Sequence, residues 1–263
     1  MTGWQMIAVA VAGFVAGSIN AVVGSGTLVT FPALLAVGVP PLTATISSSI
    51  GLTAGNVTGA LGYRRELSGQ RALLLRLLPA SVLGALAGAF LLLHLPATSF
   101  EHIVPVLVGL AVVLVLVQPL VRRALARRRA ATGTVAPDQL RIGPGRLAIL
   151  LGGAFGTGTY GGYFGASQGV LQIGIFGLLL RESLQRLNGL KNLLTLAVNV
   201  VSSGAYVVVA ADHVNWAAAA LIGGPALVGG HLGASLGRQL PAPVLRGAIA
   251  VLGIVAIVVL ETR

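Results

Sequence analysis

Long apolar stretches recur along the chain from one end to the other, separated by short polar or glycine-rich segments. A helix of about 20 apolar residues is long enough to cross the hydrocarbon core of a bilayer. Polar and apolar residues do not alternate in these stretches, as they do in the strands of an outer-membrane β-barrel. The pattern therefore predicts an all-α polytopic membrane protein. The clearest stretches are 4–23, 72–93, 103–121, 187–210 and 244–260.

Shorter interruptions divide the chain further, into two sets of five apolar segments. The second segment of the first set, residues 27–38, would form a helix of about 18 Å, which is too short to cross about 30 Å of hydrocarbon. We therefore expect the first two segments of each set to form either a hairpin with its tip inside the membrane or two tilted spans. The expected segments are 4–23, 27–38, 43–62, 72–93 and 102–121 in the first set, and 147–164, 168–180, 187–210, 214–236 and 244–260 in the second.

The two sets correspond to each other as an internal duplication. Gly24 matches Gly165 at a spacing of 141 residues, and Gly88 matches Gly233 at a spacing of 145. Because each unit has an odd number of segments, the second copy enters the membrane from the opposite side, which predicts an inverted-topology repeat. The expected organisation is a first membrane repeat at 1–121, an Arg-rich linker at 122–146 and a second membrane repeat at 147–263.

The distribution of charge predicts the orientation. Only 9% of the residues are charged, against roughly a quarter in soluble domains. Under the topology above, 16 of the 17 Lys and Arg residues lie on one side of the membrane, and that side is the cytoplasm. We expect a multi-pass protein of a bacterial-type inner (cell) membrane, with both termini outside and the 122–146 linker in the cytoplasm. The positions of the Lys and Arg residues are then explained by membrane topology and not by a nucleic-acid-binding surface, so no nucleic-acid partner is expected.

The tips of the two expected hairpins are rich in glycine and small hydroxyl residues. These residues interrupt a helix, and the backbone groups that they free need partners inside a membrane. The helix that follows each break carries about half a positive charge at its N-terminus, so two such ends meeting near the midplane would bind an anion without a formal charge. Close packing of helices is the alternative explanation, but matched breaks in both units favour a site. The substrate-binding candidates at the tips are Asn20, Gly24, Ser25, Gly26, Thr27, Gly165, Ser167 and Gln168.

The third segments add further candidates. Lys191 is the only lysine of the chain and lies within an apolar segment, where an ionisable residue is a functional candidate. It lies about one turn into its segment, so its side chain could equally extend to the cytoplasmic face. Ser48 is its counterpart in the first unit at a spacing of 143, and Asn192 follows it directly. We include all three among the residues expected to bind substrate.

A longer motif extends this interpretation. The first unit reads Asn20-Ala-Val-Val-Gly-Ser-Gly-Thr-Leu-Val-Thr-Phe-Pro-Ala-Leu-Leu, followed by Gly38-Val39-Pro40, and the second unit carries the glycine run between 156 and 169. With the two-unit, Arg-linked layout, this sequence resembles the TauE/SafE sulfite exporters of the sulfonate-uptake permease superfamily over nearly its whole length. Family members usually have a third glycine where this chain has Ser25. The resemblance implies a transporter of sulfur-containing anions.

We therefore expect a membrane transporter of a small sulfur-containing anion, sulfite or an organosulfonate such as sulfoacetate, that works by alternating access around a midplane site. The expected partners are the anionic substrate and the lipid bilayer. The chain has no Cys and no pair of intramembrane carboxylates, so we expect no metal, no cofactor and no enzyme activity. An anion channel or leak pathway, and a non-transport membrane assembly factor, are the alternatives. The sequence leaves the anion, the direction of transport, the coupling ion and the oligomeric state open.

Overall fold

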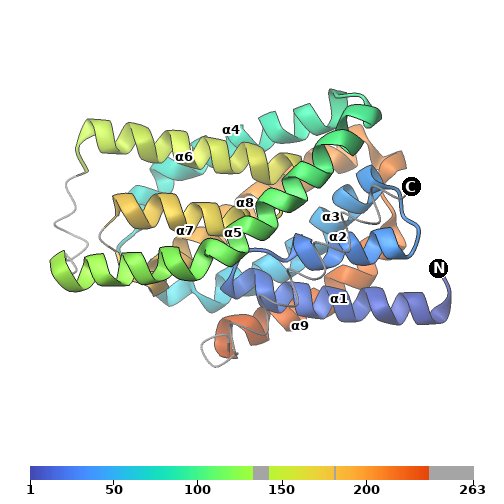
Figure 1. The fold of residues 1–263 in the computed structure, drawn as a ribbon, viewed down its shortest axis with the longest axis horizontal. Helices are drawn as coiled ribbons and strands as arrows, with labels where there is room; N and C mark the ends of the chain where they lie inside the picture. Colours follow the sequence, from blue (N-terminus) through green and yellow to red (C-terminus); the bar gives the residue numbers. More distant parts are fainter. Residues whose placement is uncertain (133–141, 181, 237–263) are drawn as a thin grey trace.

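The computed structural model describes residues 1–132, 142–180 and 182–236, which form helices joined by short turns, with no strand among them (Figure 1). The all-α fold predicted from the sequence is confirmed. The expected segment at 244–260 lies outside the described residues. The elements are α1 (Gly3–Val22), α2 (Thr27–Ala36), α3 (Pro41–Gly62), the 3-10 helix η1 (Arg64–Leu67), α4 (Arg71–His94), α5 (Ala97–Thr132), α6 (Pro144–Tyr163), α7 (Gln168–Leu179), α8 (Leu184–Val209), the 3-10 turn η3 (Ala211–His213) and α9 (Trp216–Leu236).

Several helices begin at residues that favour a helix N-terminus. Thr2 and Gln5 form a reciprocal capping box at the start of α1, which satisfies backbone N–H groups that have no partner within the helix. Pro41 and Pro144 occupy the first positions of α3 and α6, where the missing N–H and the fixed φ are suited to a helix start. Ser183 accepts a hydrogen bond from a backbone N–H in the first turn of α8. These signals place most helix ends within three residues of the predicted boundaries.

The end of α5 differs from the prediction. The segment was expected to end at residue 121, but α5 continues to Thr132 and has 36 residues, a length of about 54 Å. The first part of the expected 122–146 linker is therefore helical. It consists mainly of Ala, Leu and Arg, which have high helix propensity, and it contains no glycine or proline that would end the helix. The apolar run ends at residue 121, but the helix does not end there.

Five of the described helices, α1, α4, α5, α8 and α9, are both long and apolar enough to cross a membrane. Their outward side chains include large apolar residues that are mostly exposed, such as Leu75, Val106 and Val208, as expected of a surface that faces lipid. Trp4 and Trp216 lie exposed at the starts of α1 and α9, where tryptophan is enriched at membrane–water interfaces. These features identify a multi-pass membrane protein.

The helices pack in matched pairs. α1 packs along α9 and α4 packs along α6, while α3 contacts α9 and α8 contacts α4. α3 and α8 also pack against each other. The first helix of each expected repeat therefore lies against the fourth helix of the other repeat, so the two units are intertwined and not side by side.

Glycines permit the closest of these contacts. A Cβ on Gly88 of α4 would come within 3.0 Å of the backbone of Thr159 in α6, and a Cβ on Gly233 of α9 would do the same at Ser18 in α1. Small residues let membrane helices approach to this distance. Gly88 matches Gly233 in the proposed duplication, and their partners Ser18 and Thr159 are themselves 141 residues apart. The same contact thus occurs at both crossings.

The short helices α2 and α7 lie inside the bundle. They have 10 and 12 residues, about 15 and 18 Å, and cannot cross the hydrocarbon alone. α2 folds back against α1, and α7 folds back against α6. Figure 1 shows the start of α1 at one end of the molecule and the start of α6 at the opposite end. The two helical hairpins therefore extend toward each other.

Candidate functional site

The first helix of each hairpin ends in the same way. Four residues separate α1 from α2, and four separate α6 from α7. In the first break, Gly24 has φ +84°, and in the second, Gly165 has φ +79°. The left-handed conformation is open to glycine because glycine has no Cβ, and it commonly ends a helix. The N–H groups of Gly24 and Gly165 donate to the carbonyls of Ile19 and Tyr160, at 3.3 and 3.1 Å, which completes the two matched helix ends.

The two breaks are in direct contact. The backbone N–H of Gly169 donates to the carbonyl of Gly24 over 3.3 Å, and the hydroxyls of Ser167 and Ser25 are hydrogen-bonded to each other over 3.2 Å. A Cβ on Gly24 would lie 2.6 Å from the Cα of Gly169, so the two backbones touch. The structure therefore brings together the glycines and serines that the sequence singled out in separate halves of the chain.

Both helices that follow the breaks start at this contact. α2 begins at Thr27 and α7 at Gln168, and the first N–H groups of a helix have no partner within it. Ser167, directly before α7, has φ +63° and is the one non-glycine residue with positive φ among those described. Backbone strain of this kind is concentrated at functional sites. Its hydroxyl also donates to the carbonyl of Ala111 in α5, at 3.1 Å, which fixes its orientation.

Unpaired buried amides lie at the start of α7. The side chain of Gln168 is 1% exposed, and neither its Nε2 nor its Oε1 has a hydrogen-bond partner among the described residues. It occupies the space that a Cβ on Gly161 would fill. One turn later, Gln172 accepts a hydrogen bond from Thr195 over 3.1 Å but leaves its own Nε2 unpaired. Buried amides normally have partners, so these donors are suited to a ligand or to water.

Asn20, by contrast, is bonded within the protein. Its Oδ1 accepts a hydrogen bond from the N–H of Gly26 over 3.1 Å, and its Nδ2 donates to Oδ1 of Asn56 in α3. The hydroxyls of Ser48 in α3 and Thr30 in α2 are hydrogen-bonded to each other. Asn20 therefore holds the first break in shape, while Ser48 contacts α2 beyond its first turn.

Lys191 lies at the other side of the first break. Its side chain is fully buried, and Nζ donates to the carbonyls of Asn20 and Ala21 at 3.0 and 3.1 Å. Nδ2 of Asn192 also donates to the carbonyl of Ala21, at 3.1 Å. The lysine therefore does not extend to the surface, which was one of the two interpretations of its position. It binds the C-terminal end of α1.

Two residues of α5 join this arrangement and were not among the predicted candidates. Arg122 donates from Nη2 to the carbonyl of Val22 at 2.9 Å, and Gln118 donates from Nε2 to the carbonyl of Val23 at 3.4 Å. Arg122 had been assigned to the linker because the apolar run ends at residue 121. Gln118 is a polar residue in an otherwise apolar segment, and that feature alone could have identified it.

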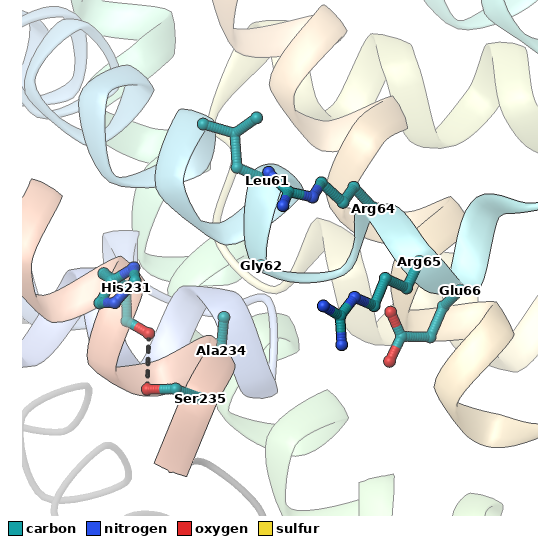
Figure 2. Close-up of a pocket in the computed structure, with 8 residues that line it drawn as sticks. All are labelled: Leu61, Gly62, Arg64, Arg65, Glu66, His231, Ala234 and Ser235. Atoms are coloured by element: carbon teal, nitrogen blue, oxygen red, sulfur yellow. Dashed lines mark hydrogen bonds between the residues drawn. The ribbon is translucent and has the colours of Figure 1, made fainter.

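A separate cavity of about 730 Å³ lies between the end of α3, η1 and the end of α9. Figure 2 shows Arg64 and Arg65 on one wall and His231 on the other, with the hydroxyl of Ser235 bonded to the backbone carbonyl of His231. No predicted substrate-binding residue lines it. The described lining residues are Leu61, Gly62, Arg64, Arg65, Glu66, His231, Ala234 and Ser235.

Known proteins resemble this chain over most of its length. The family model of the sulfite exporter TauE/SafE matches residues 9–260. The probable membrane transporter protein YfcA of Escherichia coli (strain K12) is 26% identical over 229 residues, which cover 86% of this chain and 76% of that protein. The probable membrane transporter protein ORF9 of Sinorhizobium sp. is 32% identical over 97 residues, 37% of each chain. No solved structure matches. The chain belongs to the TauE/SafE family of membrane transporters, as the motif around Gly24 predicted.

Proposed function

We propose that the protein carries a small sulfur-containing anion, sulfite or an organosulfonate such as sulfoacetate, across the cell membrane by alternating access around the two breaks. The main support for this proposal is that the N-termini of α2 and α7 meet beside the buried amide of Gln168, which has no partner among the described residues. The family is described as sulfite exporters, which supports the class of anion. The two relatives named above are described as probable membrane transporters, which supports transport over an assembly role.

In the proposed binding mode, oxygen atoms of the anion accept hydrogen bonds from neutral donors. The N–H groups of Leu28, Val29, Gly169 and Val170 already donate to backbone carbonyls. The proposed backbone donors are therefore those of Thr27 and Gln168, the first residues of α2 and α7. The hydroxyls of Ser25 and Ser167 and the amide of Gln168 add side-chain donors. A site made of dipoles suits transport because the anion must also leave, and a site that binds too tightly cannot release its ligand. Gly24 and Gly165 supply the backbone shape that exposes these donors.

The present arrangement is closed at the breaks. The backbones of Gly24 and Gly169 are too close to admit even a Cβ between them, and Ser25 and Ser167 are fully buried. An anion can therefore reach this position only when the two hairpins move apart. A carrier needs a barrier that opens to one side of the membrane at a time, whereas a channel needs a continuous path from one side to the other. This contact favours the carrier over the channel.

The proposed orientation places both termini outside and the segment between α5 and α6 in the cytoplasm. In Figure 1, the N-terminus lies at one end of the molecule, and the end of α5 and the start of α6 lie at the opposite end. Arg122, Arg123 and Arg127 lie in the last part of α5, and Arg146 lies in the first turn of α6, so the positive-inside rule supports this assignment. The basic cavity of Figure 2, with Arg64 and Arg65, would then concentrate anions at the cytoplasmic side.

Uptake by proteoliposomes tests the proposal. Purified protein is reconstituted, and the flux of radiolabelled sulfite, sulfoacetate and sulfate is measured, with protein-free liposomes as the control. We expect saturable uptake of sulfite or sulfoacetate, and acceleration when the same unlabelled anion is present on the opposite side. Flux that rises linearly with concentration and shows no such exchange would favour a channel. The absence of flux for all sulfur anions would contradict the proposed substrate class.

A further inference from the structure

The C-terminal end of α1 is covered by side chains from two other helices. The last carbonyls of a helix have no partner within it, and inside a membrane water does not satisfy them. Here Lys191 and Asn192 of α8 bind the carbonyls of Asn20 and Ala21. From α5, Arg122 donates to the carbonyl of Val22 and Gln118 donates to the carbonyl of Val23. Every one of these four carbonyls therefore accepts a hydrogen bond from a side chain.

Positive charge is suited to this place. The C-terminal end of a helix carries about half a negative charge, and α1 ends directly at the contact between the two breaks. Half-helix C-termini and unwound carbonyls coordinate the coupling cations of several secondary transporters. The ammonium of Lys191 lies 3.0 and 3.1 Å from two such carbonyl oxygens, in the position that a bound cation would take.

The second unit lacks this arrangement among the described residues. At the end of α6, the carbonyl of Gly162 accepts a hydrogen bond from the hydroxyl of Tyr206, which is a neutral donor. Ser48, the counterpart of Lys191 at a spacing of 143, is bonded to Thr30 instead. The ammonium is thus specific to the end of α1 and is not a general requirement of the fold.

We propose that the end of α1 is a monovalent-cation site and that the protonated side chain of Lys191 is its built-in occupant. A small cation such as Na⁺ or an alkylammonium would bind there only after the lysine is removed. The native protein then needs no external cation at this position. Lys191 supplies the positive charge that neutralises the carbonyls of Asn20 and Ala21.

This occupant also lies close to the proposed anion position, and this part of the inference rests on the proposed function. A Cβ on Gly169, in the first turn of α7, would lie 2.8 Å from Cδ of Lys191, so the lysine stem packs beside that turn. Without the ammonium, the carbonyls of Asn20 and Ala21 would lose their positive partner, and only Arg122, at the carbonyl of Val22, would offset the negative end of α1. The ammonium of Lys191 screens the negative end of α1 from the anion. This allows two helix N-termini and one helix C-terminus to lie in the same small region.

Thermal unfolding of the wild type, Lys191→Ala and Lys191→Met in detergent tests the cation site. In Lys191→Ala, removal of the side chain leaves space for ethylammonium beside the two carbonyls. Lys191→Met retains most of the volume of the stem without the charge, and is the matched control. Each variant and the wild type are measured in ethylammonium, sodium and choline chloride at equal ionic strength, with choline as a cation too large for the site.

We expect the Tm of the wild type to be the same in all three salts. Lys191→Ala should unfold at least about 5 °C lower in choline, and ethylammonium or Na⁺ should restore at least half of that loss. Lys191→Met should also unfold at a lower temperature, without recovery in ethylammonium. Equal Tm values for Lys191→Ala in all three salts, or equal recovery of Lys191→Met, would overturn the proposal.

Lys191→Met decides the matter alone if Lys191→Ala does not fold. If the charge of Lys191 did not offset the carbonyls, replacing it by an apolar side chain would be neutral or stabilising. A Tm of Lys191→Met at or above that of the wild type would therefore overturn the proposal. These measurements need no substrate, and they remain valid if sulfite is not transported. In proteoliposomes, we further expect wild-type anion flux to be unchanged when Na⁺ is replaced by choline.

Discussion

The backbone N–H of Gly169, in the first turn of α7, donates a hydrogen bond to the carbonyl of Gly24, in the break before α2, over 3.3 Å. These residues lie in different halves of the chain, so this bond joins the two hairpins at their tips. Neither glycine leaves room for a Cβ. The contact is therefore both the closure of the proposed pathway and the point at which the geometry of the site is most sensitive to substitution.

The first prediction concerns the conformation of the breaks. Gly24→Val combined with Gly165→Val should reduce anion flux to below about one tenth of the wild-type value, because positive φ is strained for a residue with a Cβ, most of all for a β-branched one. Flux is measured per amount of purified, monodisperse protein. Gly204→Val is the matched control, since a Cβ there meets no atom within 4 Å. Normal flux in the double variant would remove the breaks from the transport mechanism.

The second prediction separates binding from stability at Gln168. Gln168→Leu removes a buried amide that has no partner among the described residues, so the variant should be at least as stable as the wild type. It should nevertheless bind the anion more weakly, with a KM at least about tenfold higher, a loss of about 1.4 kcal/mol. Thermal unfolding and saturation kinetics are measured on the same preparation. A variant that loses stability while its KM stays unchanged would indicate a purely structural glutamine.

The third prediction concerns the charge of Lys191. Lys191→Gln should raise the apparent KM for the anion, because the positive charge beside the first turn of α7 is lost while a neutral donor remains. A loss of about 1–3 kcal/mol corresponds to a KM increase of roughly 5- to 150-fold. Saturation kinetics in proteoliposomes measure it. Unchanged kinetics would confine Lys191 to holding the end of α1.

The fourth prediction concerns topology. The chain has no native Cys, so a single introduced Cys reports its own position. Gly3 and Gly145 are exposed, and a Cβ on either meets no atom within 4 Å. A membrane-impermeant maleimide added to intact cells should label Gly3→Cys and should not label Gly145→Cys until the membrane is opened. The reverse pattern would invert the proposed orientation, and labelling of both would contradict the number of crossings.

The fifth prediction tests the duplication through helix packing. Gly88 and Gly233 make the same kind of backbone contact at the two matched crossings. Gly88→Val and Gly233→Val should therefore lower the Tm by similar amounts, each by several degrees, because the helices must separate to accept the side chain. Gly204→Val again serves as the control. A large loss at one crossing with none at the other would argue against equivalent roles.

The parts of the fold that depend on local chemistry could be predicted from the sequence. Apolar segment length predicted the spans, and glycine-rich sequence around Gly24 and Gly165 predicted where the helices break. The helix α5 extends beyond the expected apolar segment because helix formation depends on the propensity of residues 122–132 and not on their hydropathy. The partners of Lys191 could not be predicted, since Asn20 and Ala21 are about 170 residues away and only tertiary packing brings them close.

The intertwined packing of the two units also has a consequence for biosynthesis. α1 leaves the ribosome first, yet the helix against which it packs, α9, begins about 190 residues later. At about 5–20 residues per second, α1 waits roughly 10 to 40 s for that partner. During this time its glycine-lined face, with Gly13 and Gly17, is without the neighbour it has in the finished protein. The glycine-lined face of α1 therefore stays without its partner until α9 has been synthesised and inserted.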